Sequence, residues 1–281
     1  MSLPPDFHFS QGSLQDFVDC PRRFQLRYLD RIAWPAVQAE PILENERHLQ
    51  QGELFHLLVQ QHLVGVPVER LTAMAQGDAD LAGWWQAYLA AAPTELHGQR
   101  FPEVTLSAPL GVSGERRLVA KYDLVVLTPE GRAVIFDWKT SRHRAPRRWL
   151  AERLQTRVYP YLLLHAGVDL NDGRPLAVEQ IEMLYWFAGF PDRPERFAYS
   201  ADQATENEGF LNSLVEQIGL LAGGKGIFPL TPFEERCRFC VYRSLCERGT
   251  AAGSLDEVDY RDFEPEIEID LDFEQVAELE Y

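Results

Sequence analysis

The spacing of apolar residues changes along this chain, and the order of the changes limits the folds open to it. Helical spacing dominates the first third, strand-like runs separated by turn residues follow, and helical spacing then returns around one more strand-like run. This order predicts an α/β core with a helical N-terminal lobe. The expected helices are 10–28, 52–64, 81–92, 149–166 and 204–221, and the expected strands are 104–110, 118–127, 133–138 and 178–187.

The composition is that of a globular protein. The chain has 281 residues, of which 46% are hydrophobic, enough for one sizeable core. No run of eighteen apolar residues occurs, so we expect no transmembrane helix. Residues 1–9 lack the basic start and apolar stretch of a signal peptide, which predicts a cytoplasmic location. In that reducing compartment, clustered cysteines bind metal more often than they form disulfides.

The net charge of −16 is unevenly distributed. Residues 256–281 carry twelve acidic side chains and one arginine, whereas residues 132–157 carry eight Lys or Arg side chains and two acidic ones. A basic strip of this kind can bind a phosphate backbone, although such runs are also found on solvated faces. The candidate DNA contacts within the strip are Arg142, Arg144, Arg147 and Arg148.

The sharpest chemical signal is Asp123 together with Asp137 and Lys139. Residues i and i+2 of a strand point to the same face, so Asp137 and Lys139 should emerge side by side. Asp123 precedes a four-residue turn and can lie opposite Asp137. Two carboxylates supply hard oxygen ligands for Mg²⁺ or Mn²⁺, and the lysine can orient or activate water. Asp-x-Lys alone is more often a solvated strand end, but carboxylates in apolar strands are costly without a partner.

These residues resemble the RecB-like PD-(D/E)XK nucleases, whose D-Y/W-K-T motif is similar to Asp137-Trp138-Lys139-Thr140. Gly52-Glu53-Leu54-Phe55-His56 looks like the family's G-x-x-F-H helix, which implies that His56 joins Asp123 and Asp137 in binding metal. Gln155 and Tyr159 resemble its Q-x-x-x-Y helix and would share one helix face near the catalytic centre. The resemblance implies a restriction-endonuclease-like core, a central mixed sheet flanked by helices. Ala120 departs from the glycine that the family often has there.

The four cysteines form a second constellation. Cys237, Cys240 and Cys246 have metal-binding spacing, and Cys20 supplies a fourth thiolate. The spacing alone leaves zinc and an iron–sulfur cluster open. One cysteine before the core and three after it resembles the nuclease subunit of AddB type and the CRISPR-adaptation exonucleases, which implies a 4Fe–4S cluster. Such a cluster would staple the C-terminal loop to the N-terminal segment.

The function expected from this resemblance is metal-dependent hydrolysis of DNA phosphodiester bonds. We expect an exonuclease acting on ends or single strands in repair, recombination or CRISPR adaptation. No G-x-x-x-x-G-K-S/T loop is present, so a helicase or integrase would be a separate partner. Two alternatives remain: a non-catalytic DNA-binding module of the same fold, and a zinc-stapled interaction protein.

The acidic C-terminal tail is a separate expected unit. We expect a nuclease domain over 1–253 and a tail over 254–281. Within the tail, residues 266–274 alternate strictly between acidic and apolar side chains, which is a strand pattern. We therefore expect part of the tail to dock. Two roles stay open for it: its carboxylates could compete with DNA for the basic strip, or it is a solubilising tail or a docking peptide for a partner protein.

Overall fold

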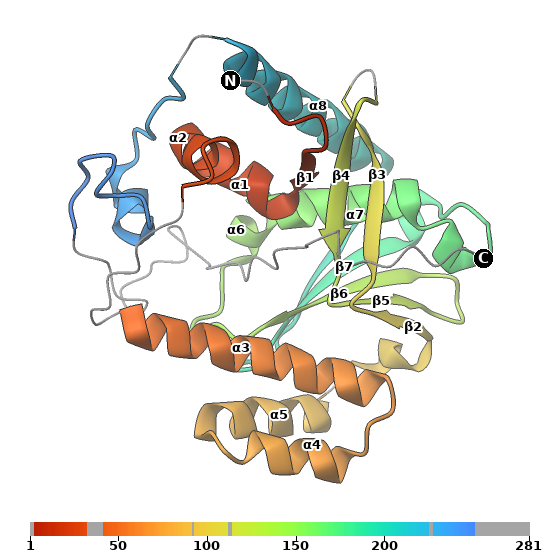
Figure 1. The fold of residues 1–281 in the computed structure, drawn as a ribbon. Coiled ribbons are helices and arrows are strands. Elements are labelled where there is room, and N and C mark those ends of the chain that lie inside the picture. The colour runs from red at the N-terminus through yellow and green to blue at the C-terminus, as the bar shows by residue number, and fades with distance from the viewer. Residues whose placement is uncertain (1–2, 33–41, 92, 112–113, 225–226, 251–281) are drawn as a thin grey trace.

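The computed structural model describes residues 3–32, 42–91, 93–111, 114–224 and 227–250. Within them the strands form two sheets, and helices cover both faces of the larger one (Figure 1). The strands are β1 (His8–Ser10), β2 (Gln99–Pro102), β3 (Thr105–Leu110), β4 (Arg116–Lys121), β5 (Leu124–Leu127), β6 (Ala133–Lys139), β7 (Ile181–Phe187) and β8 (Glu195–Ala198). The helices are α1 (Gln11–Asp19), α2 (Pro21–Phe24), α3 (Ile42–Leu63), α4 (Val68–Ala75), α5 (Ala79–Ala91), α6 (Arg147–Glu152), α7 (Leu154–Ala166) and α8 (Ala201–Gly223).

The larger sheet has the strand order β2-β5-β6-β7-β8, with β6 at its centre. Strand β6 pairs antiparallel with β5 and parallel with β7. Every residue of β6 before Lys139 is buried, as its nearly continuous apolar sequence requires of a strand covered on both faces. The expected mixed sheet flanked by helices is therefore confirmed.

The two faces of this sheet belong to two separate cores. Ile135 packs on the side of α7 and α8, whereas Phe136 packs on the side of α3, α4 and α5. Because side chains alternate along a strand, Asp137 and Lys139 continue the face of Ile135. Their polar groups thus emerge on the α7 side, where β6 ends.

The expected single strand over 118–127 is wrong. Strand β4 ends at Lys121 and pairs with β1 and β3 in the smaller sheet, whereas β5 begins at Leu124 in the larger one. Tyr122 and Asp123 carry the chain between the two sheets. Residues 118–120 of β4 and 124–126 of β5 are buried, so the apolar pattern runs through the break and does not mark it. The crossing places Asp123 at the start of β5, beside the end of β6.

The expected helix over 10–28 is interrupted at Cys20. Ser10 caps α1 by accepting a 3.0 Å hydrogen bond from the backbone N–H of Ser13. Cys20 then adopts an extended backbone with φ −160°, and Pro21, which has no N–H to donate, opens α2. A π-helical turn over Gln25–Leu29 follows. The expected helix over 149–166 is similarly divided at an extended residue, which separates α6 from α7.

The helices that precede the sheet form two groups, where the sequence predicts one N-terminal lobe. Helices α3, α4 and α5 pack together against the larger sheet. Helices α1 and α2 instead lie beside the loop that carries Cys237, Cys240 and Cys246, here called the cysteine loop, near the other end of the chain (Figure 1). The N–H of Arg22, for example, donates to the carbonyl of Pro229 at 3.1 Å.

The tail and the expected boundary at residue 253 lie outside the described residues. Among the helices of the described part, none combines the length and the apolar character needed to cross a membrane.

Candidate functional site

Two carboxylates meet where β5 begins and β6 ends. Leu124 pairs with Phe136, so the antiparallel register places Asp123 opposite Asp137, one residue beyond this pair. Oδ2 of Asp123 accepts a 2.8 Å hydrogen bond from the backbone N–H of Trp138. This contact fixes one oxygen of Asp123 against the backbone of β6.

Helix α3 brings His56 to the same place. Nδ1 of His56 lies 3.2 Å from Oδ1 of Asp123, and both side chains are about four-fifths buried, with 23% and 21% exposed. Burial disfavours the charged imidazole, but the neighbouring carboxylates of Asp123 and Asp137 outweigh it and raise the pKa of His56. Burial likewise opposes ionisation of Asp123, yet His56 and the Trp138 N–H hold the pKa of that carboxyl below its usual value. Each of the two groups therefore favours the charged form of the other.

Helix α7 closes the site from the other face through Gln155. Its Nε2 donates to Oδ1 of Asp137 at 2.5 Å, and its Oε1 accepts from Nζ of Lys139 at 3.1 Å. Nζ of Lys139 also lies 3.0 Å from Oδ2 of Asp137, whose side chain is only 4% exposed. Lys139 and Gln155 thus offset the free-energy cost of burying the Asp137 carboxylate in this strand.

Tyr159 packs against the segment that leads into Asp123. Its ring lies on that of Tyr122, with centroids 4.8 Å apart, and its carbonyl accepts a 2.9 Å hydrogen bond from the Tyr122 hydroxyl. Burial, followed by the neighbouring Tyr159, raises the pKa of Tyr122. Of the two residues expected on one face of α7, Gln155 therefore contacts the carboxylate–lysine group, and Tyr159 packs against the chain segment leading into Asp123.

A second tyrosine, missed by the sequence analysis, lies under the site. Tyr185 of β7 is the register partner of Asp137, and Nζ of Lys139 lies 5.7 Å from the centre of its ring. Its hydroxyl is 2.7 Å from Oγ1 of Thr156 on α7. Only the parallel pairing of β6 with β7 would have revealed this position, because nothing local in the sequence distinguishes Tyr185 from a core aromatic.

A charged pair flanks Asp123 on the side away from β6. The carboxylate of Glu103 forms an ion pair with Lys121, the last residue of β4. The N–H of Glu103 donates to the carbonyl of Asp123 at 3.1 Å. Glu103 adopts φ 55°, a left-handed conformation that is unfavourable for a residue with a side chain. The sequence analysis gave Glu103 no role, and its place beside Asp123 follows from the crossing between sheets.

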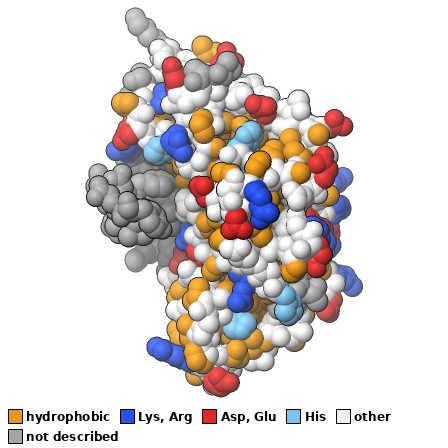
Figure 2. Space-filling model, turned by 90° about the vertical axis from the view of Figure 1, so that its right-hand side faces the viewer, with side chains coloured by type: hydrophobic (Ala, Val, Ile, Leu, Met, Phe, Trp, Pro, Cys, Tyr) orange, Lys and Arg blue, Asp and Glu red, His pale blue; other side chains and the backbone are white. Residues whose placement is uncertain are grey.

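The basic strip is partly neutralised. Arg144 and Arg147 both pair with Glu195, and their guanidinium groups lie over Phe187 and Phe197. Arg142 and Arg148, which flank them on the same loop and on α6, are exposed. On the face drawn in Figure 2, positive and negative side chains are likewise intermixed.

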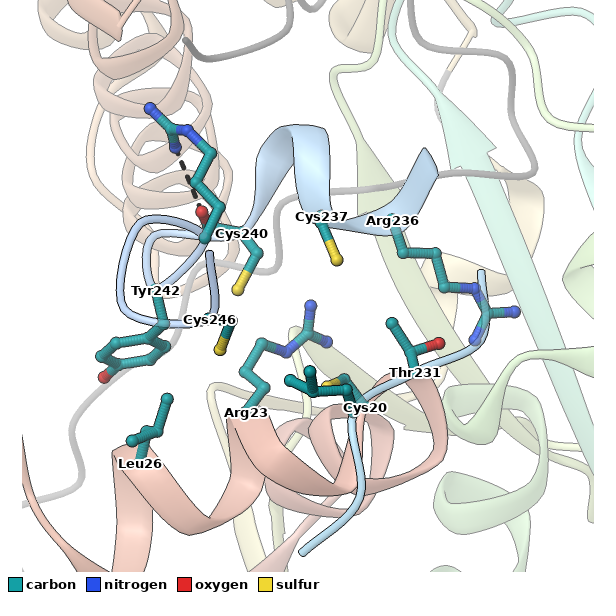
Figure 3. Close-up of a pocket in the computed structure, with 11 residues that line it drawn as sticks. Cys20, Arg23, Leu26, Thr231, Arg236, Cys237, Cys240, Tyr242 and Cys246 are labelled. Atoms are coloured by element: carbon teal, nitrogen blue, oxygen red, sulfur yellow. Dashed lines mark hydrogen bonds between the residues drawn. The ribbon is translucent and has the colours of Figure 1, made fainter. Parts of the chain in front are cut away.

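The four cysteines converge on one pocket. Cys20 enters it from the break between α1 and α2, and Cys237, Cys240 and Cys246 enter it from the loop at the other end of the chain. Figure 3 shows their sulfur atoms around a common space into which the Arg23 side chain reaches. The structure therefore brings together the one early and three late cysteines that the sequence analysis grouped.

These thiols influence one another's ionisation. Burial raises the pKa of Cys240 to about 11. Burial, followed by the neighbouring thiols of Cys20 and Cys246, also raises the pKa of Cys237. Within the part of the chain that the structure describes, no three His, Cys, Asp or Glu side chains lie close enough together to hold one metal ion. The four cysteines thus line one pocket, but no three of them stand at metal-binding spacing in the structure.

Comparison with known proteins gives a family match and distant likenesses to solved structures. The model of the PD-(D/E)XK nuclease superfamily matches residues 8–247. No curated protein matches the chain. A solved structure from Eubacterium rectale named "Putative exonuclease" is similar with 11% identity and a TM-score of 0.47, covering 78% of this chain and 82% of that one. A second, SSO0001, has 16% identity and a TM-score of 0.36, covering 72% of this chain and 98% of that one.

Proposed function

Because this chain belongs to the PD-(D/E)XK nuclease superfamily, we propose that it is a Mg²⁺- or Mn²⁺-dependent deoxyribonuclease of the RecB-like branch. The observation that carries the proposal is the meeting of Asp123, Asp137 and Lys139 at one sheet edge, between α3 and α7. A non-catalytic relative would have no need to keep two carboxylates and a lysine together in a largely buried place.

The donor types suit a hard divalent cation. Asp123, Asp137 and His56 offer carboxylate oxygens and one imidazole nitrogen. In the structure His56 contacts Asp123 and Lys139 contacts Asp137, and the three donors are not gathered at metal-binding distance around one point. When bound, Mg²⁺ or Mn²⁺ would lower the pKa of a water ligand and offset negative charge on the phosphate. We assign metal binding to these three side chains.

The remaining residues act on water and on the ligands themselves. Lys139 keeps its ammonium group beside Asp137, from where it orients the attacking water and offsets charge that develops on the phosphate. Gln155 holds both Asp137 and Lys139 in place through its two amide atoms. Tyr159, through its packing on Tyr122, supports the chain segment that carries Asp123. Arg142, Arg144, Arg147 and Arg148 contact the DNA backbone, with Arg144 and Arg147 weakened by Glu195.

The cysteine pocket holds a 4Fe–4S cluster in this proposal. Its support is that Cys20, Cys237, Cys240 and Cys246, from opposite ends of the chain, line one pocket. By joining residues far apart in sequence, the cluster would stabilise the fold by an amount on the order of several kcal/mol.

The cluster is tested by metal analysis. Anaerobically purified protein should be brown and contain iron, and Cys20→Ser or Cys240→Ser should lower iron content and unfolding temperature together. Val241→Ala, an exposed position in the same loop, serves as the matched control. About one zinc per chain without iron would contradict the cluster and favour the zinc-stapled alternative, while leaving the nuclease assignment standing.

The substrate and pathway follow from the family resemblance. We propose an exonuclease that acts on DNA ends or single strands in repair, recombination or CRISPR adaptation in the cytoplasm, beside a separate helicase or integrase. The test is a degradation assay with Mn²⁺ on single- and double-stranded DNA bearing 5′ or 3′ ends, with RNA as a competing substrate. Cleavage that EDTA and Asp137→Ala both abolish is expected. Tight DNA binding without cleavage would favour the non-catalytic alternative.

A further inference from the structure

Polar contacts run from the cysteine loop to the first turn of α7. Nη1 of Arg236, a residue lining the cysteine pocket, lies 3.3 Å from Oδ1 of Asp19. The same oxygen accepts a 3.0 Å hydrogen bond from Nε2 of Gln15. Oε1 of Gln15 in turn accepts from the backbone N–H of Leu154 at 3.4 Å. About one turn of α1, from Gln15 to Asp19, thus connects the cysteine loop with α7, against which α1 packs (Figure 1).

The first turn of α7 has no side-chain cap of its own. Its N-cap position is Arg153, which makes no capping hydrogen bond and has no acceptor atom to offer. The first N–H groups of a helix lack partners within it and are normally satisfied by a Ser, Thr, Asp or Asn side chain at the N-cap. Gln15 provides such an acceptor from another helix.

That first turn also carries Gln155, the residue next to Leu154. The side-chain amide of Gln155 holds Asp137 and Lys139, so a displacement of the turn is transmitted to both. A contact made at the N-terminal end of α7, outside the site, can therefore change the positions of Asp137 and Lys139 within the site.

We propose that Gln15 is a positioning residue: it caps α7 from α1 and, through Asp19, couples the placement of Gln155 to the cysteine loop. The inference rests on the proposed nuclease function for its catalytic consequence, but its structural part does not. The oxygen and nitrogen atoms of the Gln15 side-chain amide lie in one rigid plane. When Nε2 turns toward or away from Asp19, the Oε1 atom that accepts from the N–H of Leu154 therefore moves as well.

The cysteine loop contacts the Gln15 side chain indirectly, through Asp19. Its carboxylate accepts from Gln15, Arg23 and Arg236, and Arg23 and Arg236 both line the cysteine pocket. Asp19 also directly precedes Cys20. A rearrangement of the cysteine loop changes the partners of Asp19 and thereby the position of the Gln15 amide.

Gln15 can be replaced while α1 stays packed against α7. The neighbouring Leu14 and Phe17, which are 0% and 5% exposed, anchor α1 in the core, whereas Gln15 is half-buried. Gln15→Leu removes both hydrogen bonds at nearly constant size. Gln15→Glu keeps an oxygen that can accept from Leu154 but places a second carboxylate against Asp19. Val18→Ala changes an exposed residue of the same helix and is the control.

The experiment measures hydrogen exchange of the peptide containing Leu154 and Gln155, the Mn²⁺ concentration for half-maximal cleavage, and iron content. Gln15→Leu should accelerate exchange at the first turn of α7 and raise the half-maximal Mn²⁺ concentration by about 10-fold or more, the effect of losing support around a metal ligand. Iron content should stay at the wild-type level, and Val18→Ala should change none of the three. Gln15→Glu should fall between Gln15→Leu and wild type, and Arg236→Met should shift exchange in the same direction.

Wild-type exchange and wild-type Mn²⁺ dependence in folded Gln15→Leu protein would overturn the inference. If Gln15→Leu alters both but Arg236→Met alters neither, the link to the cysteine loop is wrong. If wild-type protein cleaves no nucleic acid, the proposed function has failed, and the exchange measurement still decides whether Gln15 caps α7.

Discussion

The backbone N–H of Trp138 donates a 2.8 Å hydrogen bond to Oδ2 of Asp123, so β6 itself aims this carboxylate. The other oxygen of Asp123 faces His56. Asp123→Asn keeps an oxygen that can accept from Trp138 but removes the negative charge. We expect the fold to persist while Mn²⁺-dependent cleavage falls by about 100-fold or more, since metal charge stabilisation contributes several kcal/mol. Cleavage rates and thermal unfolding of the same preparation check this. Wild-type cleavage by a preparation free of other nucleases would disprove the assignment of Asp123.

Gln155 and Tyr159 make a matched pair on α7. Gln155→Leu leaves Asp137 and Lys139 without their shared amide, so we expect a loss of about 10- to 100-fold in apparent metal affinity. Tyr159→Phe keeps the ring that packs on Tyr122 and should change metal affinity far less. Isothermal titration with Mn²⁺ and a cleavage assay compare the two variants. Equal losses in both would mean that the Tyr159 hydroxyl takes part in the reaction.

The sequence predicted the core of this site because its residues obey local rules. The two-residue strand period placed Asp137 and Lys139 on one face, and counting across a tight turn placed Asp123 opposite Asp137. Gln15, by contrast, caps a helix that begins 139 residues later, and only tertiary packing brings them together.

The break at Tyr122 and Asp123 was hidden for a related reason. Residues 118–120 of β4 and 124–126 of β5 are buried alike, so the apolar pattern records burial and not the sheet in which each strand lies. Tyr185 was missed because its position under Lys139 depends on which strands pair. Local patterns therefore predicted which residues come together, whereas the strand and helix contacts around them required the structure.

The His56–Asp123 pair predicts a pH dependence for the metal-free protein. The pKa of His56 is raised above 6.5, so its stabilising charge is fully present below that pH and is lost as the pH rises through the raised value. The pKa of Asp123 is lowered below 3.8, so its contribution is present above that pH and is lost as the pH falls through the lowered value. With EDTA present, we expect this pair to stabilise the protein most between about pH 4 and 6.5.

Urea unfolding of wild-type and His56→Gln protein across this range checks the expectation. The difference in unfolding free energy between the two proteins should shrink as the pH rises above 6.5. A difference that is constant from pH 5 to 9 would show that His56 carries no proton when paired with Asp123. Adding Mg²⁺ should release a proton below the raised pKa, because a metal-bound imidazole is neutral.

The last prediction concerns the acidic tail, whose twelve carboxylates lie outside the described residues. Arg144 and Arg147 already share Glu195, so part of the positive charge of this stretch is neutralised within the protein. A basic surface that is partly neutralised is easily outcompeted by a tethered polyanion. Truncation after Gly253 should therefore raise DNA affinity and cleavage at low salt, with the difference shrinking as salt screens the charges. A full-length variant with six tail carboxylates changed to amides should behave like the truncation if charge is the cause. Unchanged affinity at low salt in the folded truncation would eliminate competition with DNA and favour a tail that binds a partner protein.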